Sequence, residues 1–302
     1  MAISRAQLLK ELLPGLNALF GLEYAKYGEE TKEIFETESS DRSFEEETKL
    51  SGFSAAPVKN EGSAIEYDNA QEAFTARYTH ETVAMGFSIT EEAMEDNLYD
   101  KLSTRLTKAL ARSMASAKQT KAANVYNRAF NSSFTGGDGQ ELVSNAHPLA
   151  DGSTGSNRPT TYADLSEASL ETALIDIAGY TDDKGIPIAA QGRTLHIPRQ
   201  LVFVAERLLA SPYKPGSSDN DVNAIKSTGM LPGGYHVNHR FSDPDAFFIR
   251  TDVPNGMKMF NRAPIATSME GDFETGNVRY KSRERYSFGF SDWRGVYGNE
   301  GV

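Results

Sequence analysis

The strongest group of metal-ligating side chains in this sequence is a cluster of histidines and aspartates: His236, His239, Asp243 and Asp245. Imidazole and carboxylate groups together can bind a divalent ion, and a bound metal can activate water for hydrolysis. His236 and His239 lie in a predicted strand, where residues three apart point to opposite faces. The two rings meet at one ion only if a bulge shifts the register. A metal-dependent hydrolase using His236/His239 is therefore an alternative hypothesis.

Other catalytic motifs are incomplete. His80 and Glu81 begin like the helix motif of zinc proteases, but Ala84 stands where the second histidine would bind the metal. The sequence contains no Gly-Lys pair for a phosphate-binding loop and no G-x-S-x-G nucleophile motif. It also has no cysteine, which excludes a thiolate nucleophile and cysteine-built metal sites. We therefore predict a protein that is not an enzyme, with no catalytic residue, no cofactor and no bound metal.

Charge and hydropathy restrict the partners. The 302 residues carry a formal net charge of −11. Tight sequence-independent DNA binding requires a Lys/Arg surface that releases counterions, so an acidic chain is not expected to hold DNA tightly. No uncharged apolar run is long enough to span a bilayer, so no membrane partner is expected. Lys10 and Glu11 interrupt the first apolar stretch too early for a signal peptide.

Residues 1–41 begin with an amphipathic segment. Leu12, Leu16 and Phe20 recur at helical spacing, and Pro14-Gly15 is expected to interrupt the helix. The segment has too few apolar residues to form a core of its own. It docks either on its own domain, as such helices usually do, or on a neighbouring subunit, an option that its length leaves open.

Residues 42–89 are predicted to form a long hairpin. In residues 74–81, the side chains at even positions, from Phe74 to His80, alternate with polar or charged side chains at odd positions, from Thr75 to Glu81. This is the period of a strand with two different faces. Lys59 lies in a polar stretch near the expected tip, and Glu45 and Glu46 supply acidic side chains near the base. A hairpin of this kind is barely stable alone in water. We therefore expect it to lie on a partner.

Residues 90–130 are predicted to form one long helix. Leucine or methionine occupies every fourth position from Met94 to Met114. A helix of about forty residues would be roughly 60 Å long. Because its apolar stripe is narrow, the helix must lie across a sheet or along an interface.

The rest of the chain alternates between helical and extended patterns. Residues 131–159 are loop-like, and the block beyond them, from about Tyr162, has the mixed pattern of an α+β domain. Separate extended segments follow at 256–260, around Ile265 and at 277–290. In the last segment, apolar residues occupy one face and basic residues the other. The basic face consists of Arg279, Lys281, Arg283 and Arg285. It is a solvated face, a nucleic-acid contact or a surface for acidic segments of a neighbouring subunit.

The order of these parts resembles that of the major capsid proteins of tailed bacteriophages. The C-terminal segments look like the closing strands of a Mu-like major head subunit. The segments that carry the resemblance are 272–281, 283–286 and 289–297, supported by 13–21, 145–149 and 195–198. No one of them is a catalytic signature, and their order along almost the whole chain makes the resemblance specific.

The resemblance implies an α+β fold of the tailed-phage major capsid type, in which a long spine helix and long β-strands form a peripheral domain. The axial α+β domain would surround the fivefold and sixfold axes, and the hairpin would lie over the adjacent subunit. The implied division is an N-terminal arm at 1–41, an extended hairpin loop at 42–89, a peripheral domain at 90–130 and 255–290, and an axial domain at 131–254 and 291–302.

The implied function is that of a major capsid protein, which self-assembles into pentamers and hexamers of an icosahedral shell enclosing double-stranded DNA. The protein would be assembled in the host bacterial cytoplasm and be located in the virion, with a portal and a decoration protein as partners. Because the chain starts directly at the arm, a separate scaffolding protein is expected. The candidate subunit contacts are Leu12, Leu16, Phe20, Glu45, Glu46, Lys59, Arg279, Lys281, Arg283 and Arg285. An encapsulin-like nanocompartment shell is the alternative with the same fold.

Some related capsids crosslink a loop lysine to a neighbour's asparagine with the help of a glutamate. Lys59 lies near the expected hairpin tip, but the sequence identifies no partner for it. We therefore do not expect such a crosslink.

Overall fold

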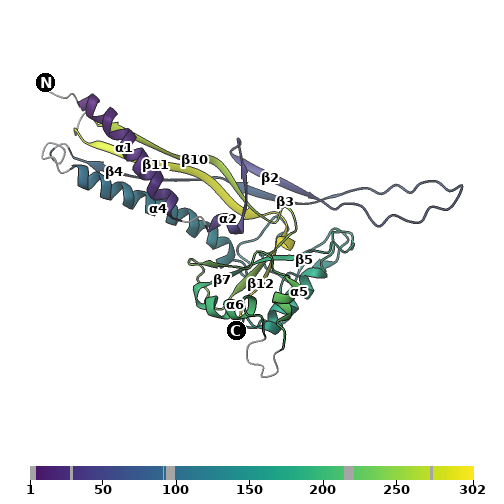
Figure 1. The fold of residues 1–302 in the computed structure, drawn as a ribbon. Coiled ribbons are helices and arrows are strands. Elements are labelled where there is room, and N and C mark those ends of the chain that lie inside the picture. Colours follow the sequence, from purple (N-terminus) through teal and green to yellow (C-terminus); the bar gives the residue numbers. More distant parts are fainter. Residues whose placement is uncertain (1–4, 28–29, 91, 93–98, 214–220, 273–274) are drawn as a thin grey trace.

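The structure, a computed structural model of the chain, describes residues 5–27, 30–90, 92, 99–213, 221–272 and 275–302, with backbone only at 5–12 and 99–101. A long sheet carries two long helices, a hairpin projects from one end of this sheet, and a smaller α+β unit lies beside the same end (Figure 1). None of the described helices is both long and apolar enough to cross a membrane.

The long sheet is formed by strands from three distant parts of the sequence. Its order is β1-β10-β11-β4, in which β10, β11 and β4 are antiparallel and β1 is parallel to β10. The strands are β1 (Glu36–Ser39), β10 (Met257–Gly271), β11 (Val278–Phe290) and β4 (Glu81–Ile89). The end of the predicted arm is thus part of the sheet.

The two extended segments predicted at 256–260 and around Ile265 belong to a single strand of 15 residues, β10. Its register with β11 shifts between Asn261 and Ala263 and again between Ala263 and Ala266. Pro264 lies inside this irregular stretch, and proline cannot donate an amide hydrogen to the ladder. The local break in the sequence pattern therefore marks an irregularity within one strand and not a turn between two.

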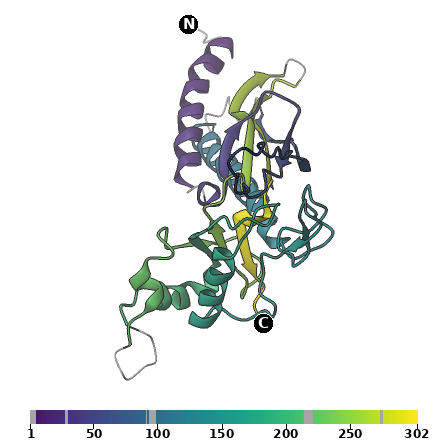
Figure 2. The ribbon, with the colours of Figure 1, turned by 90° about the vertical axis from the view of Figure 1, so that its right-hand side faces the viewer.

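Helices α1 (Arg5–Lys26) and α4 (Tyr99–Asn127) cover one face of the long sheet (Figure 2). The predicted stripe of the long helix lies across the sheet, and it shares a buried cluster with α1 and with β11. This cluster consists of Leu16, Phe20, Leu110, Ala111, Met114 and Tyr280. The predicted start of the long helix falls partly on residues 91 and 93–98, which lie outside the described residues.

The predicted interruption of the first helix is wrong, because α1 runs through Pro14 without a break. A proline inside a helix removes one hydrogen bond and costs about 3 kcal/mol. Leu16 and Phe20, two and six residues further on, are 6% and 3% exposed. Burial of two such side chains stabilises by about the same amount, so tertiary packing offsets the local cost.

The projecting hairpin consists of β2 (Phe44–Leu50) and β3 (Glu72–Thr79), which pair antiparallel. Residues 51–71 form the extended loop between them, which reaches far from the rest of the chain (Figure 1). The predicted hairpin of 42–89 was too long at its C-terminal end, because β4 pairs with β11 and not with β2. Alternating side chains indicate a strand but do not identify the strand with which it pairs.

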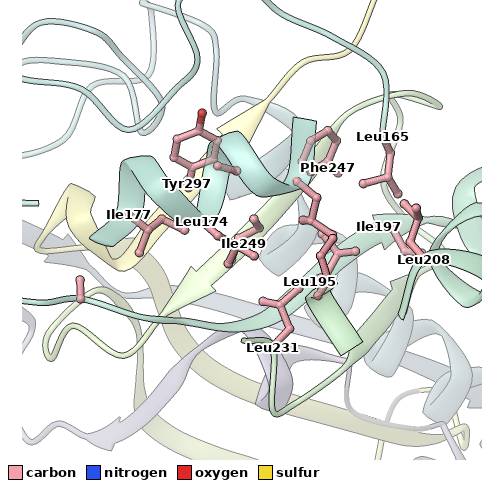
Figure 3. Packing of buried hydrophobic residues seen from close by; sticks show 14 of the residues in the cluster. Leu165, Leu174, Ile177, Leu195, Ile197, Leu208, Leu231, Phe247, Ile249 and Tyr297 are labelled. Carbon is pink, nitrogen blue, oxygen red and sulfur yellow. The ribbon is translucent and has the colours of Figure 1, made fainter. Parts of the chain in front are cut away.

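The smaller α+β unit has a four-stranded sheet of order β12-β9-β7-β8 with helices packed on it. Leu174 and Ile177 of α5 (Glu167–Ala178) pack into the same core as Leu195 and Phe247 of this sheet (Figure 3). The strands are β7 (Gly192–Pro198), β8 (Tyr235–Asn238), β9 (Phe247–Thr251) and β12 (Val296–Asn299), and the helices are α5 (Glu167–Ala178), α6 (Val202–Leu209) and α7 (Ala224–Thr228).

The C-terminal end of α4 packs where the two sheets meet. The Tyr126 ring lies 4.7 Å from that of Phe248 in β9, and the same cluster includes Met259 of β10 and Tyr286 of β11. Burial raises the pKa of Tyr126 far above its ordinary value. The two sheets therefore share one core. The remaining described elements are α2 (Thr31–Ile34), β5 (His147–Pro148), β6 (Thr154–Gly155), η1 (Arg199–Leu201) and η2 (Trp293–Gly295).

The docking of α1 on its own chain can be tested with Phe20→Ala. This change should lower the free energy of unfolding of the unassembled chain by about 3 kcal/mol, because it removes a buried ring and leaves a cavity. Leu22→Ala on the same helix is the control, and because Leu22 is 67% exposed the expected change is below about 0.5 kcal/mol. Urea denaturation measures both. Equally small changes would contradict intrachain docking.

Candidate functional site

The basic residues of β11 form one exposed face of the long sheet, on the side away from α1 and α4. Arg279, Lys281 and Arg283 are exposed and Arg285 is half-buried, which confirms the predicted two-faced strand. Arg279 forms an ion pair of 2.5 Å with Asp272. The residues opposite these four on β4 are small: Ser88, Gly86, Ala84 and Thr82. Small neighbours leave the long basic side chains accessible from solvent.

Glu284, which follows Arg283 in the sequence, belongs to the opposite face. It is 2% exposed and accepts a hydrogen bond of 3.3 Å from the Tyr24 hydroxyl. The Lys118 ammonium lies 3.9 Å from the same carboxylate. Because the strand separates the two faces, this buried acid leaves the positive character of the outer face largely intact.

Two of the arm residues proposed as subunit contacts are buried within their own chain. Leu16 and Phe20 pack against α4 and the long sheet, which corrects their assignment to an interface between subunits. Leu12 belongs to α1, and its side chain lies outside the described residues. The physical reason is that a helix stripe indicates that a face is buried, but not which chain covers it.

The candidate acidic and basic residues of the hairpin lie in different settings. Glu45 accepts a hydrogen bond of 2.6 Å from the Ser40 hydroxyl at the hairpin base. Glu46 pairs with Arg77 across the two strands, with 3.7 Å between the charged atoms. Lys59 is exposed beside the turn at residues 60–63. The structure therefore places Lys59 alone of these three candidates at the far end of the loop.

The loop carries large apolar side chains that its own chain does not cover. Four of them are more than half exposed: Phe53 at 61%, Val58 at 91%, Ile65 at 66% and Tyr67 at 89%. Full burial of one such side chain stabilises by about 2 kcal/mol. A loop with this composition gains stability only when another surface covers it, which makes it the most prominent candidate contact in the molecule.

A largely buried ionic network fastens the base of the hairpin to the smaller α+β unit. The Lys49 ammonium lies 2.8 Å from Asp292 and 3.3 Å from Asp183. Arg294, which is 2% exposed, pairs with the same two carboxylates at 3.3 and 2.9 Å. Burial opposes ionisation of Asp292, but Lys49 and Arg294 outweigh it and hold the pKa of that carboxyl below its usual value.

A second buried charge joins the hairpin base to the long sheet. The Lys258 ammonium on β10 lies 2.9 Å from the Glu38 carboxylate of β1 and also contacts Glu47 of β2. Glu47 in turn accepts a hydrogen bond from the Ser291 hydroxyl. Neither network leaves a pattern in the sequence, because their members are separated by up to about 250 positions.

The histidine cluster does not converge. His236 on β8 stacks on His196, with 5.7 Å between ring centroids, and its Nε2 lies 3.5 Å from Glu33. His239 instead faces Glu30, with 3.0 Å between Nδ1 and the carboxylate. Among the described residues, no group of three or more His, Cys, Asp or Glu side chains could hold a metal ion. The geometry therefore does not support the metal-dependent hydrolase hypothesis.

The fold of this chain combines a long helix across a long sheet, a projecting hairpin and a smaller α+β unit. Solved structures with this fold include a virus-like particle from Pyrococcus furiosus (TM-score 0.57, 11% identity, covering 95% of this chain and 98% of that chain) and the capsid of an empty GTA particle (TM-score 0.55, 15% identity, 91% of each chain). The capsid of Myoviridae phage XM1 is another (TM-score 0.50, 10% identity, 89% of each chain). At these identities the likeness shows the fold.

A family model described as phage capsid protein matches residues 72–299. The chain therefore belongs to the phage capsid protein family, and its function is that of a major capsid protein that forms the shell of a phage head. No curated protein sequence matches this chain. The Mu-like subfamily stays a prediction.

The ionic network at the hairpin base can be tested with Lys49→Met. The change leaves Asp183 and Asp292 with one cation in place of two, and should lower the free energy of unfolding by about 1–3 kcal/mol. A depressed carboxyl pKa contributes stability that is present above the unfolded value of about 3.9 and is lost as the pH falls through the folded pKa. The variant raises the pKa of Asp292, so acid unfolding should begin at a higher pH.

Urea denaturation at neutral pH and circular dichroism during acid titration measure the two effects of Lys49→Met. Arg193→Met is the matched control, because Arg193 forms an exposed pair with Asp252 at 3.8 Å. An exposed pair contributes at most about 1 kcal/mol. Indistinguishable results for the two variants would show that the network does not stabilise the hairpin base.

Proposed function

We propose that copies of this chain assemble as pentamers and hexamers of a closed icosahedral shell that encloses double-stranded DNA. The single observation that carries this proposal is the extended loop 51–71, which leaves the body of the subunit with four large apolar side chains exposed. In the shell, a neighbouring copy of the chain buries these side chains. In a closed shell the same contact repeats at every subunit, so modest contacts add up to a stable particle.

The four parts of the subunit take different roles in this proposal. The long sheet with α1 and α4 is the peripheral domain, the α+β unit containing β7 to β9 and β12 is the axial domain around the symmetry axes, and 51–71 lies over the adjacent subunit. The arm, residues 1–41, is held by its own peripheral domain through α1 and β1. The hairpin ends at Thr79, ten residues before the boundary that the sequence predicted.

Charge complementarity supports a contact between the loop and the outer face of the long sheet. Residues 51–71 contain Glu61, Glu66 and Asp68 against a single lysine, Lys59. The basic face of β11 has the opposite sign and is open to solvent. Opposite charges at a rim fix register and favour association more than they add affinity. The apolar side chains of the loop supply the affinity.

The shell acts without catalysis in this proposal, and its interior holds DNA without sequence-specific contacts. A net charge of −11 fits a container that releases its genome, because few phosphates are neutralised by protein. Assembly takes place in the host bacterial cytoplasm, with a separate scaffolding protein, a portal and a decoration protein as further partners.

Electron microscopy of the purified full chain, expressed with and without its neighbouring phage genes, tests the proposal. The unaltered chain should form closed shells, tubes or rings, and replacement of 53–69 by an Asn-Gly turn should leave a folded chain that forms none of them. The short turn suits the paired ends of β2 and β3. Shells from the shortened chain would contradict a role of the loop in assembly, and particles that contain a protein cargo without DNA would indicate a nanocompartment.

Arg283→Glu tests the basic face. The substitution should reduce shell yield about tenfold, because it places an acidic group against acidic loop residues at every repeated contact. Arg283 is exposed, so the free energy of unfolding should change by less than about 0.5 kcal/mol. Arg283→Lys keeps the charge and should assemble normally. Sedimentation of assembled particles measures the yield, and an unchanged yield for Arg283→Glu would leave β11 with a merely solvated face.

A further inference from the structure

His80 is the single residue between β3, which belongs to the hairpin, and β4, which belongs to the long sheet. It is 5% exposed. On its N-terminal side the strand pairs with β2, and on its C-terminal side it pairs with β11. Any change in the angle between hairpin and sheet must therefore alter the backbone or the contacts at His80.

The imidazole ring connects the elements that meet at this point. Its Nε2 lies 2.9 Å from the Ser40 hydroxyl, just after β1, and its Nδ1 lies 2.9 Å from the Ser287 hydroxyl of β11. Ser40 in turn donates to the Glu45 carboxylate of β2 at 2.6 Å. One side chain thus holds together the arm, the hairpin and the long sheet.

The hydrogen bond from Ser40 to Glu45 requires a proton on Nε2 of His80 and fits a neutral ring. A hydroxyl has one hydrogen, and that of Ser40 is directed to the Glu45 carboxylate, which can only accept. The Ser40 oxygen must therefore accept from Nε2–H of His80. Nδ1 is then free to accept from the Ser287 hydroxyl. A second proton on the ring would make Nδ1 a donor, so the Ser287 hydroxyl would have to rotate its hydrogen away and accept instead.

Burial and the charges around the ring oppose a second proton. Arg285 of β11 and Arg262 of β10 face His80, and burial together with these two cations lowers its pKa, while Glu45 of β2 acts in the opposite direction. Glu81, the first residue of β4, is engaged with Lys121 of α4. The ring also packs edge-on against Phe260, with 6.5 Å between centroids. A charged imidazolium is thus poorly accommodated at this junction.

We propose that His80 is a pH-sensitive hinge, which holds the hairpin at a set angle to the long sheet while its ring is neutral and releases the hairpin base when the ring gains a proton. The hinge is a property of the single chain and does not depend on the assembly proposed above. It assigns a use to a buried histidine that takes no part in the candidate contact surfaces.

The sign of the pH dependence follows from the neutral state. The ring is neutral in the folded junction and has an unfolded pKa of about 6.5. Its contribution to stability is therefore fully present above that pH, and it is lost as the pH falls through the lower folded value. Acidification below neutrality should loosen the hairpin before it unfolds the shared core.

Hydrogen exchange of the full chain, followed by mass spectrometry, tests the hinge. After correction for the intrinsic rate, peptides from 44–50 and 72–79 should exchange several-fold faster near pH 5 than near pH 7.5, since protonation of the ring removes the stability that its neutral form contributes. Peptides from 103–114 should show no such change. Uniform acceleration, or none, would overturn the proposal.

Variants separate His80 from other acid effects. His80→Gln cannot titrate and should abolish the selective acceleration, whereas His236→Gln, at a half-buried histidine on β8, should retain it. Glu45→Gln keeps an acceptor for Ser40 but removes a charge that favours protonation of His80. The pH at which the selective acceleration is half complete should therefore be lower in this variant. This third variant tests the hinge even if His80→Gln does not fold. An unchanged midpoint in Glu45→Gln, or acceleration that persists in His80→Gln, would show that another group is responsible.

Discussion

The extended loop cannot bury its own apolar side chains, and the rest of the subunit is organised around this constraint. A two-stranded projection has no second layer, so its position must be fixed where it leaves the body. Here the base is fixed by buried polar contacts: Lys49 with Asp183 and Asp292, Lys258 with Glu38, and His80 with two serines. Contacts of this kind depend strongly on geometry, so they specify an angle as well as adding stability.

The platform that carries the hairpin is held by apolar packing. Helix α4 runs across the long sheet, and its C-terminal end enters the core shared with the smaller α+β unit through Tyr126. One helix thus joins two sheets, and α1 covers the same face of the long sheet. Apolar packing thus holds together the body from which the loop projects. The junction between the hairpin and this body is instead made of polar and titratable side chains.

Charge is distributed unevenly on this acidic chain. β11 presents arginines and a lysine on its outer face, while its inner face buries Glu284 under Lys118 and Tyr24. The projecting loop has the opposite sign to the outer face. Complementary patches on one polypeptide allow identical copies to associate head to tail, and a heterologous contact of this kind closes into rings and shells. This agrees with membership of the phage capsid protein family.

The periodic elements follow from the amino-acid sequence alone: the long helix with its narrow apolar stripe, the two-faced strand β11, and the α+β character of the block before it. These follow from side-chain spacing, which is a local property. Only the tertiary structure decided which strand β4 pairs with, that α1 docks on its own chain through Phe20, and that His236 and His239 face different carboxylates. The ionic networks at the hairpin base were equally invisible, because burial and pairing between distant residues depend on how the chain folds back and leave no periodic trace in the sequence.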